Sequence, residues 1–418
     1  MNKFFINFNN LNYQFFPILL IMFLPVTLLL GSAIINISVV LIDIFFLINF
    51  IKNKKINYFS GSIFYALLIL WFSLIANSLF STNFENSIIR ALGFFRFIIL
   101  IFAIKYYISI KNFKYKEIIF KIWFIVFCIV SIDLLFEIIF GFNTLGYQSH
   151  IFGRLSGFLN QELKIGNFYF GFILLALSFS YYKFKNISFT YILLLIFLVI
   201  SFLIGERSNF IKVFLISIPF LFFINKKSLF KNMIFVSTIL LLIVTIIFSN
   251  NSYKERFYGM LIKPIINDLN TSSILRNSIY GAHYDTAFKI FKKNISFGVG
   301  LKNFRHESKK NEYKNNEFLF TEWRHTTHPH QLHLELLSET GLFGYTIFII
   351  FFIYFLTHSI KWQLQNKNAY QLSGILFLLA SLLPLLPSGS FFTTYGATIF
   401  WINFSIIEAF NKQSNKQL

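Results

Sequence analysis

The chain has 418 residues, of which 56% are hydrophobic and only 13% are charged. A soluble protein of this length could not bury so much apolar surface, so the composition excludes that class and indicates a polytopic membrane protein. The formal net charge is +20, but the lysines gather in short loops, which is typical of membrane topology rather than of nucleic-acid binding. The single cysteine, Cys128, lies in an apolar run, so no intrachain disulfide can form.

The apolar runs predict about twelve helices long enough to cross a bilayer. We place them at about residues 15–30, 34–51, 59–80, 88–108, 118–140, 168–182, 189–204, 210–224, 234–248, 342–357, 370–386 and 394–410. The first run lacks a cleavage site followed by a polar region, so we expect it to be a retained span and not a signal peptide.

Lysines follow every second run, and the positive-inside rule therefore places those loops and both termini in the cytoplasm. These lysines are Lys52, Lys54, Lys55, Lys111, Lys114, Lys116, Lys183, Lys185, Lys226, Lys227, Lys361, Lys367, Lys412 and Lys416. The chain then divides into nine spans in residues 1–248, one large extracytoplasmic loop in residues 249–340, and three spans with a cytoplasmic tail in residues 341–418.

A histidine-rich stretch joins the large loop to the tenth span. Pro329 suits the first turn of a helix, which would make His328 the cap and place His330 just inside. His330 would then share a stripe with Leu334 and Gly341, where the helix can end, kink or pack closely. The helix dipole would favour neutral imidazole, the form that a general base requires.

Two other interpretations of this stretch remain open. A histidine at a helix start is often only a cap or a surface group. His328, His330 and His333 with Glu335 could also bind a metal such as zinc, although the spacing of two between the first pair suits a strand better than a helix face.

Ionisable residues inside or beside the spans are the next candidates. Arg96, Asp133 and Glu137 lie within spans, where charged groups usually pair or face a cavity. Arg207 lies at the outer end of a short span, where it could bind a phosphate or extend to the interface. Arg154 belongs to a polar outer loop.

The large loop contains further candidates. Tyr253–Ile266 predicts a helix at the lipid interface, and Arg276 opens a second helical stretch that contains His283. A glycine-rich turn then precedes Arg305. Clustered carboxylates such as Asp-x-Asp are absent from the sequence, which favours a site without a divalent metal.

The run His330–Leu334 fits the His-[Asn/Ser/Gln]-x-x-Leu signature of the bacterial O-antigen ligase and O-antigen polymerase superfamily, which the chain resembles. Gly205–Ser208, Arg154–Gly157 and the topology agree more weakly with the same family. The resemblance implies an all-α, GT-C-like integral membrane protein of the bacterial inner membrane, with its active site facing the periplasm. It also implies a role in lipopolysaccharide biosynthesis.

The family further implies a metal-independent, inverting glycosyltransferase that uses no cofactor and takes its glycan from undecaprenyl diphosphate. His330 would be the base, and Arg207 and Arg276 would hold the diphosphate, with Arg305 as a competitor of Arg276. Substrate-binding roles are expected for Arg154, Arg305, His328, His283, Glu335 and Gln331.

Four functions compete at this point. A ligase would transfer the glycan to lipid A-core, and a polymerase would transfer it to a lipid-linked repeat unit by the same chemistry. A related protein O-oligosaccharyl transferase also remains possible. A transporter or flippase for lipid-linked sugars would instead place ionisable residues near the membrane midplane and show internal repeats. The polar residues gather at the outer face, which favours an enzyme.

Overall fold

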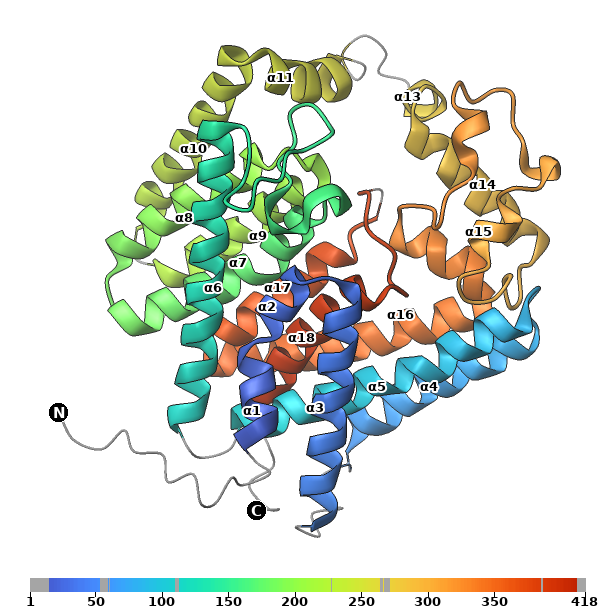
Figure 1. Ribbon diagram of the computed structural model, residues 1–418, viewed down its shortest axis with the longest axis horizontal. Coiled ribbons are helices and arrows are strands. Elements are labelled where there is room, and N and C mark those ends of the chain that lie inside the picture. Colours follow the sequence, from blue (N-terminus) through green and yellow to red (C-terminus); the bar gives the residue numbers. More distant parts are fainter. Residues whose placement is uncertain are drawn as a thin grey trace.

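The computed structural model describes residues 15–52, 59, 61–109, 113–226, 228–263, 266, 271–384 and 386–411, and these residues form helices and loops without a strand. The helices that coincide with the predicted spans are α1 (Phe15–Met22), α2 (Leu24–Leu29), α3 (Ser32–Lys52), α4 (Ser62–Leu79), α5 (Phe84–Ser109), α6 (Phe113–Phe140), α7 (Ile165–Phe184), α8 (Ile187–Leu203), α9 (Arg207–Ile224), α10 (Leu229–Ser249), α16 (Leu332–Asn366), α17 (Ala369–Ser381) and α18 (Thr394–Phe410). Figure 1 shows their arrangement.

Each predicted span therefore falls on a helix. Eight of the described helices are long and apolar enough to cross a membrane, and α8 and α17 are shorter apolar helices. The first predicted span is broken at Phe23 into α1 and α2, and Pro25 lies in the first turn of α2. The predicted all-α polytopic membrane protein is confirmed. Of the predicted cytoplasmic lysines, Lys54, Lys55, Lys111, Lys227, Lys412 and Lys416 lie outside the described residues.

Burial separates the central helices from the peripheral ones. Within the most apolar window of each helix, α7 has 83% of its residues buried, whereas α10 has only 22%. The α18 helix is also central, because it packs on α5 and α17 and buries Trp401 completely. Phenylalanines surround that indole, including Phe94 and Phe404. Most outward side chains of α10 are apolar, as expected of a helix that faces lipid.

The short helices between α10 and α16 form what we name the outer region. They are α11 (Asn251–Tyr253), η4 (Lys254–Ile262), α13 (Thr271–Arg276), α14 (Ile279–Lys293), α15 (Phe304–Glu307), η5 (Asn311–Tyr313) and η6 (Thr321–Arg324). Of these, α14 and α15 pack on α16, while α11 and η4 pack on α10. A small separate core of Ala287, Ile290, Val299, Phe304 and Tyr313 holds part of this region together. In Figure 1, α13, α14 and α15 lie on one side of the outer face, and α11 lies on the other.

A break in α16 joins the outer region to the spans. Gly341 has φ 62° and ψ −168° inside α16, which interrupts the ladder of helical hydrogen bonds. The turn around Gly298 fills the interruption, because Leu342 N donates to Ile295 O at 2.8 Å and Val299 N donates to Ser338 O at 2.9 Å. Of the options expected at Gly341, a helix end, a kink or close packing, the structure shows a kink, and the loop that fills it supplies the hydrogen bonds that the helix loses.

We expect Gly341→Ala to destabilise the protein. Its backbone conformation is almost exclusive to glycine, and a Cβ there would collide with the carbonyl of Ser296. The cost is at least ~1–3 kcal/mol from backbone strain alone, and it should appear as a lower melting temperature in detergent. Gly93→Ala is the control, since a Cβ at this helical site meets nothing within 4 Å. Equal melting temperatures for Gly341→Ala and the parent would contradict the account of the break.

Candidate functional site

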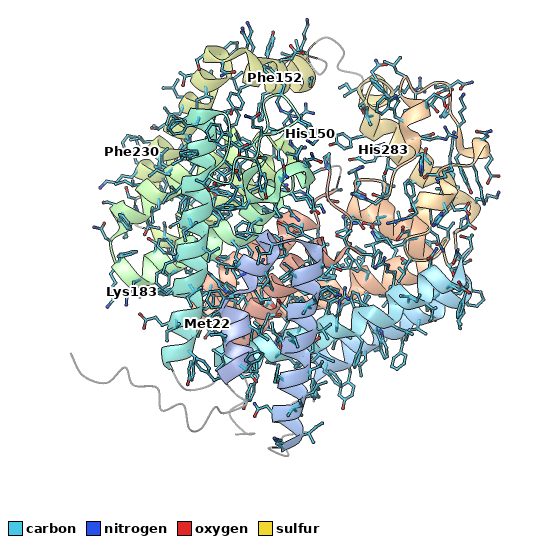
Figure 2. All side chains as sticks on the ribbon, viewed as in Figure 1. Met22, His150, Phe152, Lys183, Phe230 and His283 are labelled. Carbon is cyan, nitrogen blue, oxygen red and sulfur yellow. The ribbon has the colours of Figure 1, made fainter. Side chains whose placement is uncertain are left out.

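Three histidines from two segments meet in the outer region. The ring of His330 lies 5.3 Å from that of His283 on α14 and 4.1 Å from that of His328, measured between ring centroids. The ring of Tyr280, also on α14, meets His330 edge-on at 5.8 Å. In Figure 2, His283 lies on the side of the outer region that faces the loop of His150. The structure therefore brings together three of the predicted site residues.

The predicted helical position of His330 is wrong. The α16 helix begins at Leu332 and its cap is Gln331, whose side-chain oxygen accepts from Leu334 N at 2.6 Å. His330 precedes the cap with φ 56°, the left-handed region that few non-glycine residues adopt. Such strain persists only where neighbouring contacts fix it, and it occurs often at functional sites. His330 therefore does not share a stripe with Leu334, and His328 is not a cap.

The ring of His330 forms no hydrogen bond with any residue that the structure describes, whereas its backbone carbonyl accepts from Ser388 N at 2.8 Å. His283 Nε2 lies 3.0 Å from the carbonyl of Trp323, so this nitrogen carries the proton and donates. Its Nδ1 atom is buried without a hydrogen-bond partner among the described residues, as is Nε2 of His328. The cluster thus contains imidazole nitrogens whose hydrogen-bonding capacity is unused among the described residues.

Burial and positive neighbours keep these rings neutral. Burial, followed by the charges of His328 and His283, lowers the pKa of His330 to about 3. Burial, followed by the charge of Lys302, lowers the pKa of His328 to about 3. Burial also lowers the pKa of His283. The neutral state was predicted, but its cause is burial and crowding and not a position in the first helical turn.

Three arginines gather on the other side of the site. Arg207 begins α9 and donates from Nη1 to Arg256 O at 3.1 Å. Arg256, on η4, donates to Phe152 O at 3.2 Å and to Gly205 O at 2.8 Å. Burial, and then the charges of Arg207 and Arg154, lower the pKa of Arg256 to about 10. The three guanidinium groups therefore lie close enough to repel one another.

Carboxylates hold the loop that carries Arg154 in place. Asp133 accepts from Thr144 N at 2.9 Å, and Glu137 accepts from Ser156 N at 2.7 Å. The two intramembrane acids thus bind backbone groups of the loop and not a substrate. Arg154 itself pairs with Glu206 at 2.8 Å.

Tyr280 connects the histidines with the arginines. Its phenol lies within electrostatic reach of Arg207 and Arg256, while its ring edge faces His330. The sequence pattern did not single out Tyr280 or Arg256. Arg256 lies in a stretch predicted to be an interfacial helix, where basic residues are expected for other reasons.

Arg276 and Arg305 occupy different surroundings. Arg276 ends α13 instead of opening α14, which begins at Ile279, and its side chain is half exposed and paired with Glu317 at 3.0 Å. Arg305 belongs to α15, and its charge acts on His328. Its Nε atom is buried without a hydrogen-bond partner among the described residues. The structure therefore brings Arg305, rather than Arg276, beside the histidines.

The side chains of Glu335 and His333 contact other residues of the protein. Glu335 is fully buried and accepts from Phe391 N at 2.9 Å. His333 approaches Tyr345 Oη at 3.1 Å and Leu382 O at 2.8 Å. His328, His330, His333 and Glu335 thus do not converge. Within the described parts of the chain, no group of three or more His, Cys, Asp or Glu side chains is arranged to hold a metal ion.

The fold and the site together define a polytopic membrane protein with neutral histidines and an arginine cluster at one face. Residues 192–349 match the model of a family described as O-Antigen ligase. The match begins within α8 and ends within α16, so it includes Arg207, Arg256, Arg305 and the three clustered histidines. The resemblance predicted from the histidine signature is confirmed, and the chain is similar to the O-antigen ligase and polymerase superfamily. No curated protein matches the chain.

We expect stability to fall in acid because of the histidine cluster. An unfolded histidine has a pKa of about 6.5, whereas the folded pKa of His328 and of His330 is about 3. Below about pH 6.5 the unfolded chain binds more protons than the folded one, so stability present above that pH is lost as the pH falls toward 3. Melting temperatures in detergent at pH 7.5 and 5 would show the loss.

The double variant His328→Gln/His330→Gln should show a smaller decrease in melting temperature between these two pH values. His306→Gln, at an exposed position on α15, is the control and should retain the full decrease. An unchanged decrease in the double variant would contradict the assignment of the pH dependence to the cluster.

Proposed function

We propose that the chain is a glycosyltransferase that moves a glycan from undecaprenyl diphosphate to an acceptor hydroxyl, and that it acts as an O-antigen ligase with lipid A-core as acceptor. The observation that carries this proposal is the placement of His330, a neutral imidazole without a hydrogen bond to any described residue, against the ring of Tyr280, whose phenol acts electrostatically on Arg207 and Arg256. The O-antigen ligase match over the same residues supports it.

In this proposal the acceptor oxygen attacks the anomeric carbon while the bond from that carbon to the diphosphate oxygen breaks. His330 takes the proton of the attacking hydroxyl, and undecaprenyl diphosphate leaves with the bonding electrons. Attack opposite the leaving group inverts the anomeric centre. Neutral imidazole is available at physiological pH, and the charge of a bound diphosphate would raise its pKa and make it a stronger base.

Arg207, Arg256 and Arg305 hold the diphosphate in this proposal, because each lies near the histidine cluster or Tyr280. Guanidinium groups bind phosphate oxygens in a bidentate fork and stabilise the charge that the leaving group gains. Their crowding favours an anion between them. Arg154 acts from the edge of the site, where Glu206 already neutralises part of its charge.

The donor and acceptor are amphipathic, so the site must lie where lipid and water meet. Lys52 is the last residue of α3, and Lys367 caps the C-terminal end of α16, whereas the histidines lie before the N-terminal end of α16. The positive-inside rule assigns such lysine-bearing ends to the cytoplasm. We therefore place the protein in the bacterial inner membrane, with its site facing the periplasm and its polyprenyl donor reaching the site from the bilayer.

Replacement of the proposed base should abolish glycan transfer. We expect His330→Ala to lower the rate by roughly 10²–10⁴-fold, the usual contribution of a general base. Surface glycans of cells would then lack long chains on lipid A, with protein level checked by blot. His306→Ala serves as the matched control. A normal glycan profile in His330→Ala cells would refute the mechanism.

The lipid-carrier pool of the same cells separates the two members of the superfamily. Full-length chains accumulate on the carrier when a ligase fails, whereas single repeat units accumulate when a polymerase fails. Accumulation of single units would therefore identify the protein as a polymerase and not a ligase, while the proposed chemistry would stay the same. Loss of donor flipping in vesicles would instead indicate a transporter.

Two arginines that looked alike in the sequence should differ in effect. Arg305→Ala removes a charge beside His328 and should lower kcat/KM by about 10–100-fold, as expected for a charged hydrogen bond. Arg276→Ala breaks an exposed ion pair, which typically costs under about 1 kcal/mol, so transfer should remain near normal. Steady-state transfer in proteoliposomes measures both. The reverse order of effects would restore Arg276 as the diphosphate ligand.

A further inference from the structure

The segment Pro387–Phe391, between α17 and α18, touches both sides of the site; we name it the bridge segment. On the arginine side, the carbonyl of Pro387 accepts from Lys212 Nζ at 3.0 Å and from Ser208 Oγ. Both donors belong to α9, which begins with Arg207. In Figure 1 this part of the chain rises through the centre of the molecule, between the two sides of the outer face.

On the histidine side, the bridge segment contacts both His330 and α16. Ser388 N donates to His330 O at 2.8 Å, directly at the residue with the left-handed backbone. Ser390 Oγ donates to Glu335, and Phe391 N donates to the same carboxylate at 2.9 Å. The bridge segment is thus hydrogen-bonded to the base candidate and to the helix that follows it.

A buried ion pair locks this junction. Lys302 Nζ lies 3.8 Å from Glu335 Oε1 and also donates to Ser390 Oγ. Lys302, Glu335 and Ser390 are 5%, 0% and 3% exposed. Both charges bond to Ser390 of the bridge segment, so movement of the segment away from α16 would take a hydrogen-bond partner from each buried charge, which is destabilising.

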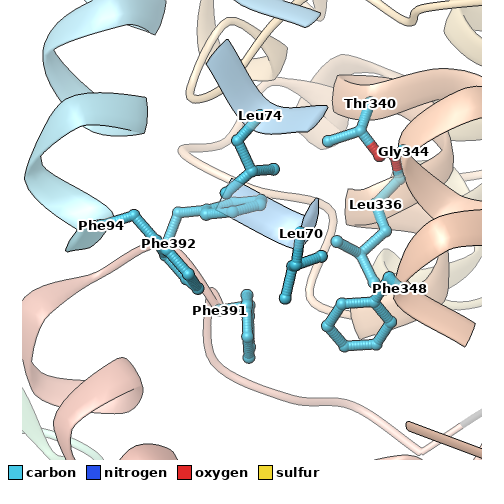
Figure 3. Close-up of a pocket in the computed structure, with 9 residues that line it drawn as sticks. All are labelled: Leu70, Leu74, Phe94, Leu336, Thr340, Gly344, Phe348, Phe391 and Phe392. Carbon is cyan, nitrogen blue, oxygen red and sulfur yellow. Dashed lines mark hydrogen bonds between the residues drawn. The ribbon is translucent and has the colours of Figure 1, made fainter. Parts of the chain in front are cut away.

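Apolar packing against α16 and α18 also holds the bridge segment. Phe391 packs against Phe348 of α16 and Trp401 of α18. Figure 3 shows Phe391 and Phe392 lining an apolar cavity with Leu336, one turn into α16. The segment is therefore fixed by polar contacts at the site and by aromatic contacts in the core.

We propose that the bridge segment is a positioning element that sets the spacing between the arginine cluster and His330, with Ser390 and the Lys302–Glu335 pair as its positioning residues. The effect on catalysis rests on the proposed function. The effect of the segment on the spacing between the two sides does not depend on it. Glu335 acts through the bridge segment and does not touch the substrate.

The structural part is tested by distance measurement in the full-length protein. Spin labels at Lys254→Cys on η4 and Lys292→Cys on α14, both exposed positions, report the two sides in a Cys128→Ala background. We expect Ser390→Ala and the charge-free double variant Lys302→Met/Glu335→Gln to broaden the distance distribution. Gly389→Ala is the matched control and should leave it unchanged, because a Cβ there meets nothing within 4 Å.

The catalytic part is tested by steady-state transfer. Ser390→Ala should lower kcat by about tenfold to a hundredfold, the usual consequence of small misplacement, while KM for the lipid-linked donor stays near its parental value. Ser390→Thr keeps the hydroxyl and should restore most of kcat. A rise in the donor KM with kcat unchanged would contradict a positioning role. So would a threonine variant whose kcat does not recover.

Failure of this inference differs from failure of the proposed function. Unchanged label distances in Ser390→Ala and the double variant overturn the bridge segment as a positioning element, whatever the enzyme does. Broadened distances in these variants, together with a parent protein that transfers no glycan, would instead retain the structural part and reject the proposed function.

Discussion

The outer face depends on one constraint: a backbone that leaves helical geometry beside a membrane must find its hydrogen-bond partners within the protein. The break at Gly341 meets this constraint through the turn at Gly298, whose residues donate and accept at the gap. The same constraint explains the buried acids. Glu137 accepts three hydrogen bonds from Ser156 and Gly157, and Glu339 accepts from the backbone of Lys302. Acids in this region therefore mainly stabilise loops.

This use of the carboxylates determines the electrostatics of the site. Glu137, Glu335 and Glu339 are occupied by other donors, and within the described part of the chain the hydrogen bonds of Arg207 and Arg256 go to carbonyl oxygens. The acid that the described residues place among these arginines is Glu206, which pairs with Arg154. The positive surroundings suit an anion and disfavour protonated histidine. One arrangement thus explains both an attraction for diphosphate and a neutral base.

The sequence predicted the helices well, because long apolar runs in a membrane can satisfy their backbone only as helices. It also gave a kink as one of the options at Gly341, and it singled out His330 and Arg207, whose roles stay predictions. It misplaced the helix start, because Pro329 suits a first turn, whereas the structure uses Gln331 as the cap. Arg256 was missed because its importance comes from contacts with Phe152 and Gly205, far away in the chain. Such long-range contacts leave no local pattern.

The same limitation applies to the segment between α17 and α18, which the sequence shows only as a short turn of proline, serine and glycine. Its role depends on α9 and α16 meeting there. Arg207 and Arg256 belong to α9 and η4, whereas Arg305 and the histidines belong to α14, α15 and the approach to α16, so the proposed diphosphate ligands come from both sides of the site. Transfer between a held diphosphate and an activated hydroxyl tolerates little misplacement. The chemistry therefore depends on the rigidity of the junction as much as on the groups that react.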